Sequence, residues 1–199
     1  MKSLKKVFLG MLSVALLATL FAAPAYAESG TYVFDEVGVL SSSEFQSLEK
    51  QGADYASKYG IGVYIQFTDT MNGNLSPTSS ERNEYGRQVF LQKGLGVGSG
   101  QNGILVVVAV QSRDYVTVKH FADSGQDPFS DSAVDSLEGK YTSELSENDW
   151  YEAAREYYNV AGEQMDYPRI FAMLKSGDFS PESYMLNVLN SERYRNITA

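Results

Sequence analysis

The stretch NGILVVVAV, residues 102–110, is apolar without interruption after its first two positions. Glycines precede it and polar residues 111–114 follow it, so its length is that of a single strand. A strand with one face in water alternates apolar and polar side chains, and this stretch does not. It therefore predicts a central strand buried on both faces of a sheet, with helices above and below.

Two strand–helix pairs precede this central strand. Residues 31–34 form a short strand, and the capping-box pattern of Ser41 and Glu44 starts a helix after it. Residues 61–68 form the next strand, which leads into a helix over residues 79–93. Because helical crossovers join parallel strands, this order predicts a parallel sheet core with right-handed connections.

Behind the central strand the chain turns back at once. Residues 112–114 leave room only for a hairpin, so residues 115–121 return antiparallel as an edge strand. Ser130 or Asp131 starts a third helix, and Asn148 caps a fourth. We therefore predict an α/β fold, a three-layer α/β/α sandwich around a mixed, mainly parallel sheet of about four strands with an antiparallel hairpin at its edge.

The N-terminus has the pattern of a secretory signal peptide. Three lysines precede an apolar run over residues 7–23, and Ala25-Tyr26-Ala27 has the small-x-small order of a cleavage site. Cleavage after Ala27 makes residues 1–27 the signal peptide, although the run also reaches the short end of a membrane anchor. We expect an exported protein, extracellular or in the cell envelope, with no transmembrane segment after the signal.

The mature chain divides into a domain of residues 28–166 and a helical tail of residues 167–199. The tail could dock on the domain, bind a partner or be the remnant of a longer chain. Loss of the signal lysines reduces 16 basic residues to 13, against 25 acidic ones, a balance of −12. That charge disfavours nucleic acid and suits divalent cations or basic partners. We expect a monomer.

Acidic side chains follow the ends of the predicted strands. Asp35, Asp69 and Asp114 each stand where open sheets bind ligands. Carboxylate oxygens are the ligands of calcium and magnesium, whereas the usual zinc ligands are missing because the chain has no cysteine and one histidine. Asp35 and Asp131 could equally be turn and cap residues. Arg113 could clamp an oxyanion or lie solvated in its turn.

Five motifs, in this order, resemble the TPM domain family. They are VFDEVGVLS at 33–41, NGILVVV at 102–108, SRDY at 112–115, FSD at 129–131 and NDWYEAA at 148–154. The resemblance covers about residues 31–165. It implies an α/β/α sandwich with an acidic surface cleft that holds a divalent ion such as calcium in some relatives, and a weak acid-phosphatase activity in plant members.

The resemblance also implies site residues. The implied metal ligands are Asp35, Asp69 and Asp131, and the candidate ligand or anion contacts are Asn102, Arg113 and Asp114. The cofactor is then a divalent cation, calcium or magnesium. The chain departs from the family pattern over residues 120–129, which lack the usual pair of glycines.

These observations lead to two functional expectations. The first is an exported TPM-domain protein with a cation-binding acidic cleft that acts as a non-catalytic envelope module in the assembly or turnover of membrane complexes, with an envelope or membrane-complex protein as its partner. The alternative is a weak metal-dependent acid phosphatase acting on phosphomonoesters. The chain has no basic cluster, no cysteine and no second histidine to grip a phosphate, which favours the first.

Overall fold

A computed structural model describes residues 30–176, except for the side chains of Gln126 and residues 169–176. The signal peptide expected over residues 1–27 lies outside the described residues, as does the chain from residue 177 onward. The elements are β1 Val33–Asp35, α2 Ser42–Tyr59, β2 Gly62–Thr68, α3 Ser79–Gln92, β3 Gly103–Ala109, β4 Asp114–His120, the 3-10 helix η1 Ser124–Gln126, α4 Asp131–Glu147 and α5 Trp150–Ser176.

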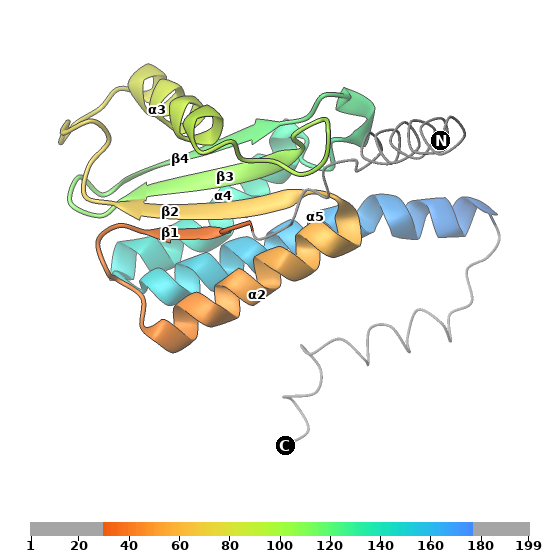
Figure 1. Cartoon of the computed structure of the whole chain (residues 1–199), viewed down its shortest axis with the longest axis horizontal. Coiled ribbons are helices and arrows are strands. Elements are labelled where there is room, and N and C mark those ends of the chain that lie inside the picture. Colours follow the sequence, from red (N-terminus) through yellow and green to blue (C-terminus); the bar gives the residue numbers. More distant parts are fainter. Residues whose placement is uncertain (1–29, 177–199) are drawn as a thin grey trace, which may run out of the picture. The chain divides into compact units, whose positions relative to one another are not determined.

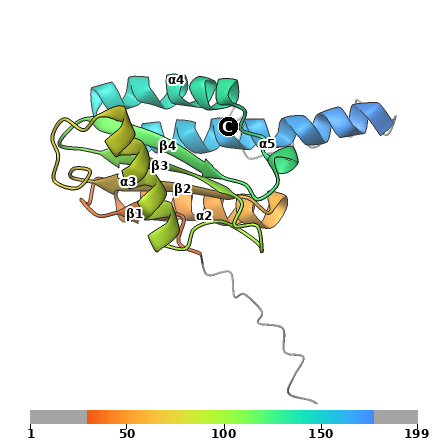
Figure 2. The same cartoon turned by 90° about the horizontal axis from the view of Figure 1, so that it is seen from above.

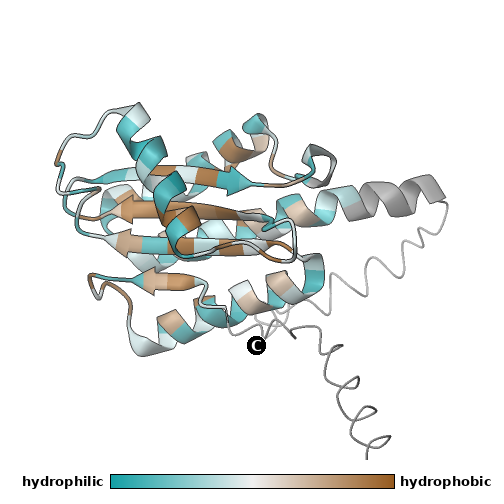
Figure 3. Cartoon of the chain, turned by 45° about the horizontal axis from the view of Figure 1, so that its top comes forward, coloured by the Kyte–Doolittle hydropathy of each residue, from teal (hydrophilic) through white to brown (hydrophobic). Residues whose placement is uncertain are grey.

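The four strands form one sheet in the order β1-β2-β3-β4. Strands β1, β2 and β3 are parallel, and β4 runs antiparallel to β3. The predicted mixed sheet with a hairpin at its edge is therefore confirmed. Every residue of β3 is buried, as its apolar sequence requires, and Figure 3 shows brown residues concentrated on the strands in the middle of the domain.

Helices cover both faces of the sheet (Figures 1 and 2). Helices α2, α4 and α5 pack on one face, with a core that includes Phe67, Val106 and Tyr157. The single helix α3 covers the other face, with a core that includes Tyr64, Val107 and Phe90. The three-layer sandwich is confirmed, with one layer of three helices and one of a single helix.

The helices begin where polar caps satisfy their first amides. Both α2 and α3 start with complete capping boxes, Ser41 with Glu44 and Thr78 with Glu81. In each box the cap hydroxyl accepts from the amide of the glutamate three residues later, while that glutamate's carboxylate accepts from the cap amide. These local sequences therefore define the helix starts without help from the rest of the fold.

Helix α5 is held to the sheet by buried tyrosine hydroxyls. Tyr157 donates to the carbonyl oxygen of Ile104 at 3.2 Å. Tyr158 donates to the carbonyl oxygens of Tyr32 and Val63, each at 3.1 Å. A hydroxyl buried without a partner costs about 1–3 kcal/mol, so these bonds fix how α5 lies over the strands.

The junction of α4 and α5 corrects one prediction. Asn148 ends α4 in a left-handed conformation with φ 62°, a geometry that asparagine tolerates well. The cap of α5 is Asp149 instead, because its carboxylate accepts from the Glu152 amide at 3.1 Å.

Helix α5 then continues through residue 166, the predicted domain end, to Ser176. None of the helices between residues 30 and 176 has the length and apolarity to cross a bilayer.

Candidate functional site

The carboxyl ends of β1, β2 and β3 lie at the same end of the sheet, which we call the carboxyl edge, and open sheets bind ligands there. Asp35 ends β1, and Asp69 directly follows β2. Arg113 and Asp114 reach the same edge because the β3–β4 hairpin turns there, with Ala109 paired to Asp114. Four of the six predicted site residues therefore gather at this edge.

The Asp35 carboxylate closes the loop between β1 and α2. Its Oδ1 accepts from the amides of Gly38 and Val39 at 2.8 and 3.1 Å, and its Oδ2 accepts from Leu40 at 2.9 Å. Since a carboxylate offers about four acceptor sites, three backbone bonds leave it little capacity for a further ligand. Asp35 therefore acts as a turn residue, because its carboxylate satisfies the backbone amides of the loop that follows β1.

Asp69 is the open carboxylate at this edge. The residue is exposed, and its side chain makes no hydrogen bond or ion pair with any residue from 30 to 176. Strand alternation puts it on the same face of the sheet as Asp35 and Phe67. The register leaves the Asp35 and Asp69 backbones about 8 Å apart, and only the Asp69 carboxylate is free to turn, because Asp35 is held by its own loop.

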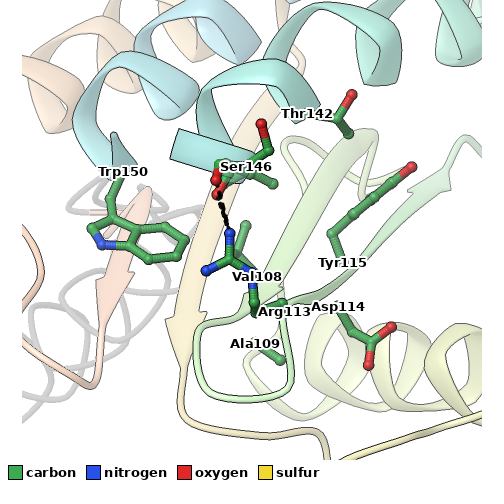
Figure 4. A pocket seen from close by; sticks show the side chains of 9 residues that line it. Val108, Ala109, Arg113, Asp114, Tyr115, Thr142, Ser146 and Trp150 are labelled. Carbon is green, nitrogen blue, oxygen red and sulfur yellow. Dashed lines mark hydrogen bonds between the residues drawn. The ribbon is translucent and has the colours of Figure 1, made fainter. Parts of the chain in front are cut away.

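Arg113 binds the end of α4. Its Nη1 donates to Oδ1 of Asn148 at 2.7 Å, and its Nη2 donates to the carbonyl oxygen of Ser146 at 2.9 Å. Figure 4 shows the guanidinium reaching up to the last turn of α4, with Trp150 on one side and Tyr115 on the other. These bonds satisfy carbonyls that a helix end leaves free, and they occupy both terminal nitrogens.

A small cavity of about 150 Å³ lies beside this contact. Its walls come from the end of β3, the hairpin, the last turns of α4 and Trp150 at the start of α5. The Trp150 ring meets Phe67 edge to face at 6.5 Å. Asp114, at the rim, forms an ion pair with Arg82 of α3 at 2.9 Å. The charged groups that border the cavity, Arg113 and Asp114, are thus already bound to other residues of the same chain.

The other two predicted site residues lie at the opposite end of the sheet. Asn102 precedes β3, and its Oδ1 accepts from the Ala122 amide at 3.2 Å. Asp131 starts α4 with a fully exposed side chain, 3.8 Å from the ammonium of Lys119. The aspartate predicted as a metal ligand at this position therefore contacts the far end of β4.

The expected meeting of Asp35, Asp69 and Asp131 at one ion does not occur. Lys119 is level with Ile104, whereas Asp35 is level with Phe67, so the two ends are about 13 Å apart along the strands and about 14 Å apart across them. Calcium needs its oxygen ligands at about 2.3–2.6 Å. Between residues 30 and 176 no group of three or more acidic or histidine side chains could hold a metal ion.

Sequence reasoning missed the residues that complete the cavity. Thr142 and Ser146 line it from α4, and Arg82 pairs with its rim from α3. Arg82 and Asp114 are 32 positions apart, and no local pattern indicates that they meet. The only available signal was Trp150, the single tryptophan of the chain, placed at a helix start.

The fold and this edge define a class, the small α/β/α domains whose open sheet ends in a hairpin. A family model described as the TPM domain matches residues 33–164. The chain belongs to the TPM domain family, as its five motifs indicated. Among curated protein sequences, none matches this chain.

Three solved structures share the fold. An N-terminal domain of a protein from P. gingivalis superposes with a TM-score of 0.58 at 16% identity, covering 70% of this chain and 85% of that one. The N-terminal domain of cg2496 from Corynebacterium glutamicum gives 0.53 at 18%, covering 73% and 86%. The BA42 protein from Bizionia argentinensis gives 0.52 at 16%, covering 64% and 81%.

Proposed function

We propose that this TPM domain is a non-catalytic module that works outside the cytoplasm, in the cell envelope, by binding other proteins there. The observation that supports this role is the engagement of charged groups at the carboxyl edge. Arg113 binds the end of α4, Asp114 pairs with Arg82, and Asp35 holds its own loop. A substrate or phosphate needs donors and acceptors with capacity left over, and the hydrogen bonds of these three groups use most of theirs.

The alternative, a metal-dependent phosphatase, needs both an ion and a clamp for the phosphate oxygens. The two arginines near this site, Arg82 and Arg113, are already bound to other residues of the chain, Asp114 and Asn148. No nucleophilic cysteine exists in the chain, and the one histidine, His120, lies at the opposite end of β4. Phosphate hydrolysis therefore has little to support it.

Binding of a divalent cation remains part of the proposal, in a reduced form. Asp69 is exposed and unpaired among residues 30–176, and Asp35 lies on the adjacent strand facing the same side. Asp69, aided by loop carbonyls, water and the little acceptor capacity that Asp35 has left, corresponds to the weak calcium sites of extracellular modules, with dissociation constants of about 0.1–1 mM. Asp69 would hold the ion, and the ion would stiffen the loops of this edge.

One set of measurements tests the role of this edge. The mature chain from Glu28, its Asp69→Asn variant and an Asp54→Asn control are assayed for aryl phosphate hydrolysis and for melting temperature with calcium or magnesium. Asp54 is also an exposed acid, on α2, where it pairs with Lys50 at 2.6 Å. Its variant controls for the loss of one negative charge, and the quantity compared is the rise that metal causes in each protein. We expect no hydrolysis from any of the three, and a rise in melting temperature at millimolar metal that only Asp69→Asn loses.

Each outcome bears on one part of the proposal. Hydrolysis by the mature chain that Asp69→Asn abolishes would overturn the non-catalytic role and establish the phosphatase. A melting temperature that metal leaves unchanged, or raises equally in all three proteins, would remove the cation from the proposal. Asp69 is the better probe than Asp35, because replacing Asp35 breaks three backbone hydrogen bonds and perturbs the fold itself.

A further inference from the structure

Strand β4 has an open edge. At the two ends of β3, the Val110 amide donates to the Thr68 carbonyl and the Asn102 carbonyl accepts from the Gly62 amide. The backbone amides and carbonyls of the even-numbered residues therefore point to β2, and those of the odd-numbered residues point to β4. The register then pairs the odd residues of β3 with the even residues of β4. The outward amides and carbonyls of β4 are consequently those of Tyr115, Thr117 and Lys119. Between residues 30 and 176 these backbone groups have no partner.

This edge runs along the floor of a trough. Seen from above in Figure 2, β4 passes between α3 on one side and α4 on the other. A hollow of about 220 Å³ is lined by β4, by Arg113 of the hairpin turn, by Ser79, Arg82 and Asn83 of α3, and by Glu138 of α4. Both arginines are already engaged, Arg82 by Asp114 and Arg113 by the end of α4. Natural sheets protect their edges with prolines, bulges, charged side chains or covering segments. Strand β4 has no proline, and its lysine, Lys119, is engaged by Asp127 and Asp131 near the far end of the strand.

The α4 wall of the trough is acidic. Asp131, Asp135 and Glu138 follow helical spacing, so they form one stripe along α4. Asp131 reaches Lys119 on β4, and Glu138 lines the hollow, which places this stripe beside the edge. The carboxylates of Asp135 and Glu138 make no hydrogen bond or ion pair within residues 30–176. An added strand would therefore meet free negative charge on its α4 side.

We propose that β4 accepts an extended, basic segment of a partner protein as a fifth strand of the sheet. Its backbone would bond to the outward groups of Tyr115, Thr117 and Lys119, and its alternate side chains would face α4. Lysine or arginine at those alternate positions matches the free carboxylates of α4. The net charge of −9 favours encounter with such a partner. This inference rests on the proposed binding role and names the surface that performs it.

A lone extended segment fits this trough better than a second copy of the chain. Both walls, α3 and α4, border the edge. A second copy pairing through its own β4 would bring its own two helices against them. A single strand needs only the spacing of about 4.8 Å from β4.

The probe is a fluorescein-labelled peptide of about seven residues in which lysine alternates with valine, the length of an ordinary strand. Fluorescence anisotropy measures its affinity for the mature chain and two variants. Thr117→Pro removes one outward amide without breaking a bond of β4 to β3. Thr117→Val is its matched control, because both changes lose the hydroxyl contact with Tyr141 at 2.9 Å. We expect Thr117→Pro to weaken binding about tenfold or more and Thr117→Val to leave it within about twofold.

Two peptide controls and one spectroscopic measurement complete the test. A peptide with glutamate in place of lysine should bind at least about tenfold more weakly, since it faces the acidic stripe. A peptide methylated at alternate backbone nitrogens should lose binding, since it cannot pair with β4. Amide hydrogen exchange should slow at Tyr115, Thr117 and Lys119 when the unmodified peptide is added, and stay constant at Val116 and Val118, which are already bonded to β3.

Several results would overturn the inference. Equal affinity of the methylated and unmethylated peptides would mean that the lysines bind surface charge alone. Equal affinity of Thr117→Pro and wild type, with both proteins folded, would exclude pairing at this edge. Protection of the three amides in the free protein, increasing with its concentration, would show that a second copy covers β4. None of these results depends on the metal and phosphatase assays, so failure here is distinguishable from failure of those proposals.

Discussion

At the scale of single residues, the charged side chains at the carboxyl edge are explained by what they bind. Arg113 adopts a left-handed backbone with φ 56°, at the end of the β3–β4 loop. This conformation, uncommon for a large side chain, directs the guanidinium to the carbonyls at the end of α4. Positive charge at a helix C-terminus also interacts favourably with the helix dipole. Arg113 therefore joins the hairpin to α4.

Arg113→Ala should destabilise the domain by about 1–2 kcal/mol, because it leaves Ser146 and Asn148 without their donor. Urea denaturation followed by circular dichroism measures the change. Arg113→Lys is the control: it keeps the charge but loses the forked geometry, so it should recover only part of the loss. If Arg113→Ala were as stable as wild type, the contact with α4 would have no structural role.

At the scale of elements, the closeness of α3 to β4 depends on one glycine. A Cβ at Gly86 would lie 2.8 Å from Cγ1 of Val118 and 3.1 Å from Cγ1 of Val116. The first distance is shorter than real Cβ contacts and the second is tighter than most, so a side chain at this position requires α3 or the two valine side chains to shift. Gly86 thus sets how closely α3 approaches β4, and with it the width of the trough at the edge.

Gly86→Ala should destabilise the domain by about 1–3 kcal/mol, because the methyl group overpacks the contact with β4. The matched control is Gly139→Ala in α4, where no heavy atom lies within 4 Å. There alanine should stabilise by about 0.5–1 kcal/mol through its higher helix propensity. Thermal unfolding of the two variants gives opposite shifts in melting temperature. Shifts of the same sign would contradict the packing argument.

At the scale of the whole molecule, buried tyrosines connect the layers. Burial raises the pKa of the Tyr141, Tyr157 and Tyr158 hydroxyls well above the ordinary tyrosine value. The folded protein therefore holds these protons more tightly than the unfolded chain does. The stabilisation is complete below the ordinary tyrosine pKa and declines as the pH rises above it.

The domain should consequently unfold in alkali, at a pH above about 10, where the unfolded tyrosines ionise. Tyrosinate absorbance should rise in two stages, exposed residues such as Tyr167 first and the buried ones only as circular dichroism reports unfolding. Tyr141→Phe should make the decline in stability less steep, since one buried proton is removed. Ionisation of every tyrosine in the folded protein would contradict this account.

Much of the fold followed from local patterns in the sequence. The apolar run of residues 102–110 predicted the buried central strand, because a strand covered on both faces excludes polar side chains. The capping box of Ser41 and Glu44 predicted the start of α2, because its hydrogen bonds span only three positions. The motif order predicted the TPM domain family, which the family model confirms.

The site was decided by tertiary structure. Sequence reasoning grouped Asp131 with Asp35 and Asp69, but the return of β4 carries the chain to the far end of the sheet before α4 begins. It also left the role of Arg113 open, because the end of α4 that Arg113 binds begins 32 positions later in the sequence. The sequence by itself determined the strands, the start of α2 and the family, since these depend on neighbours along the chain. Which charges are free and which are bound depends on contacts between distant segments, and only the packed structure brings those segments together.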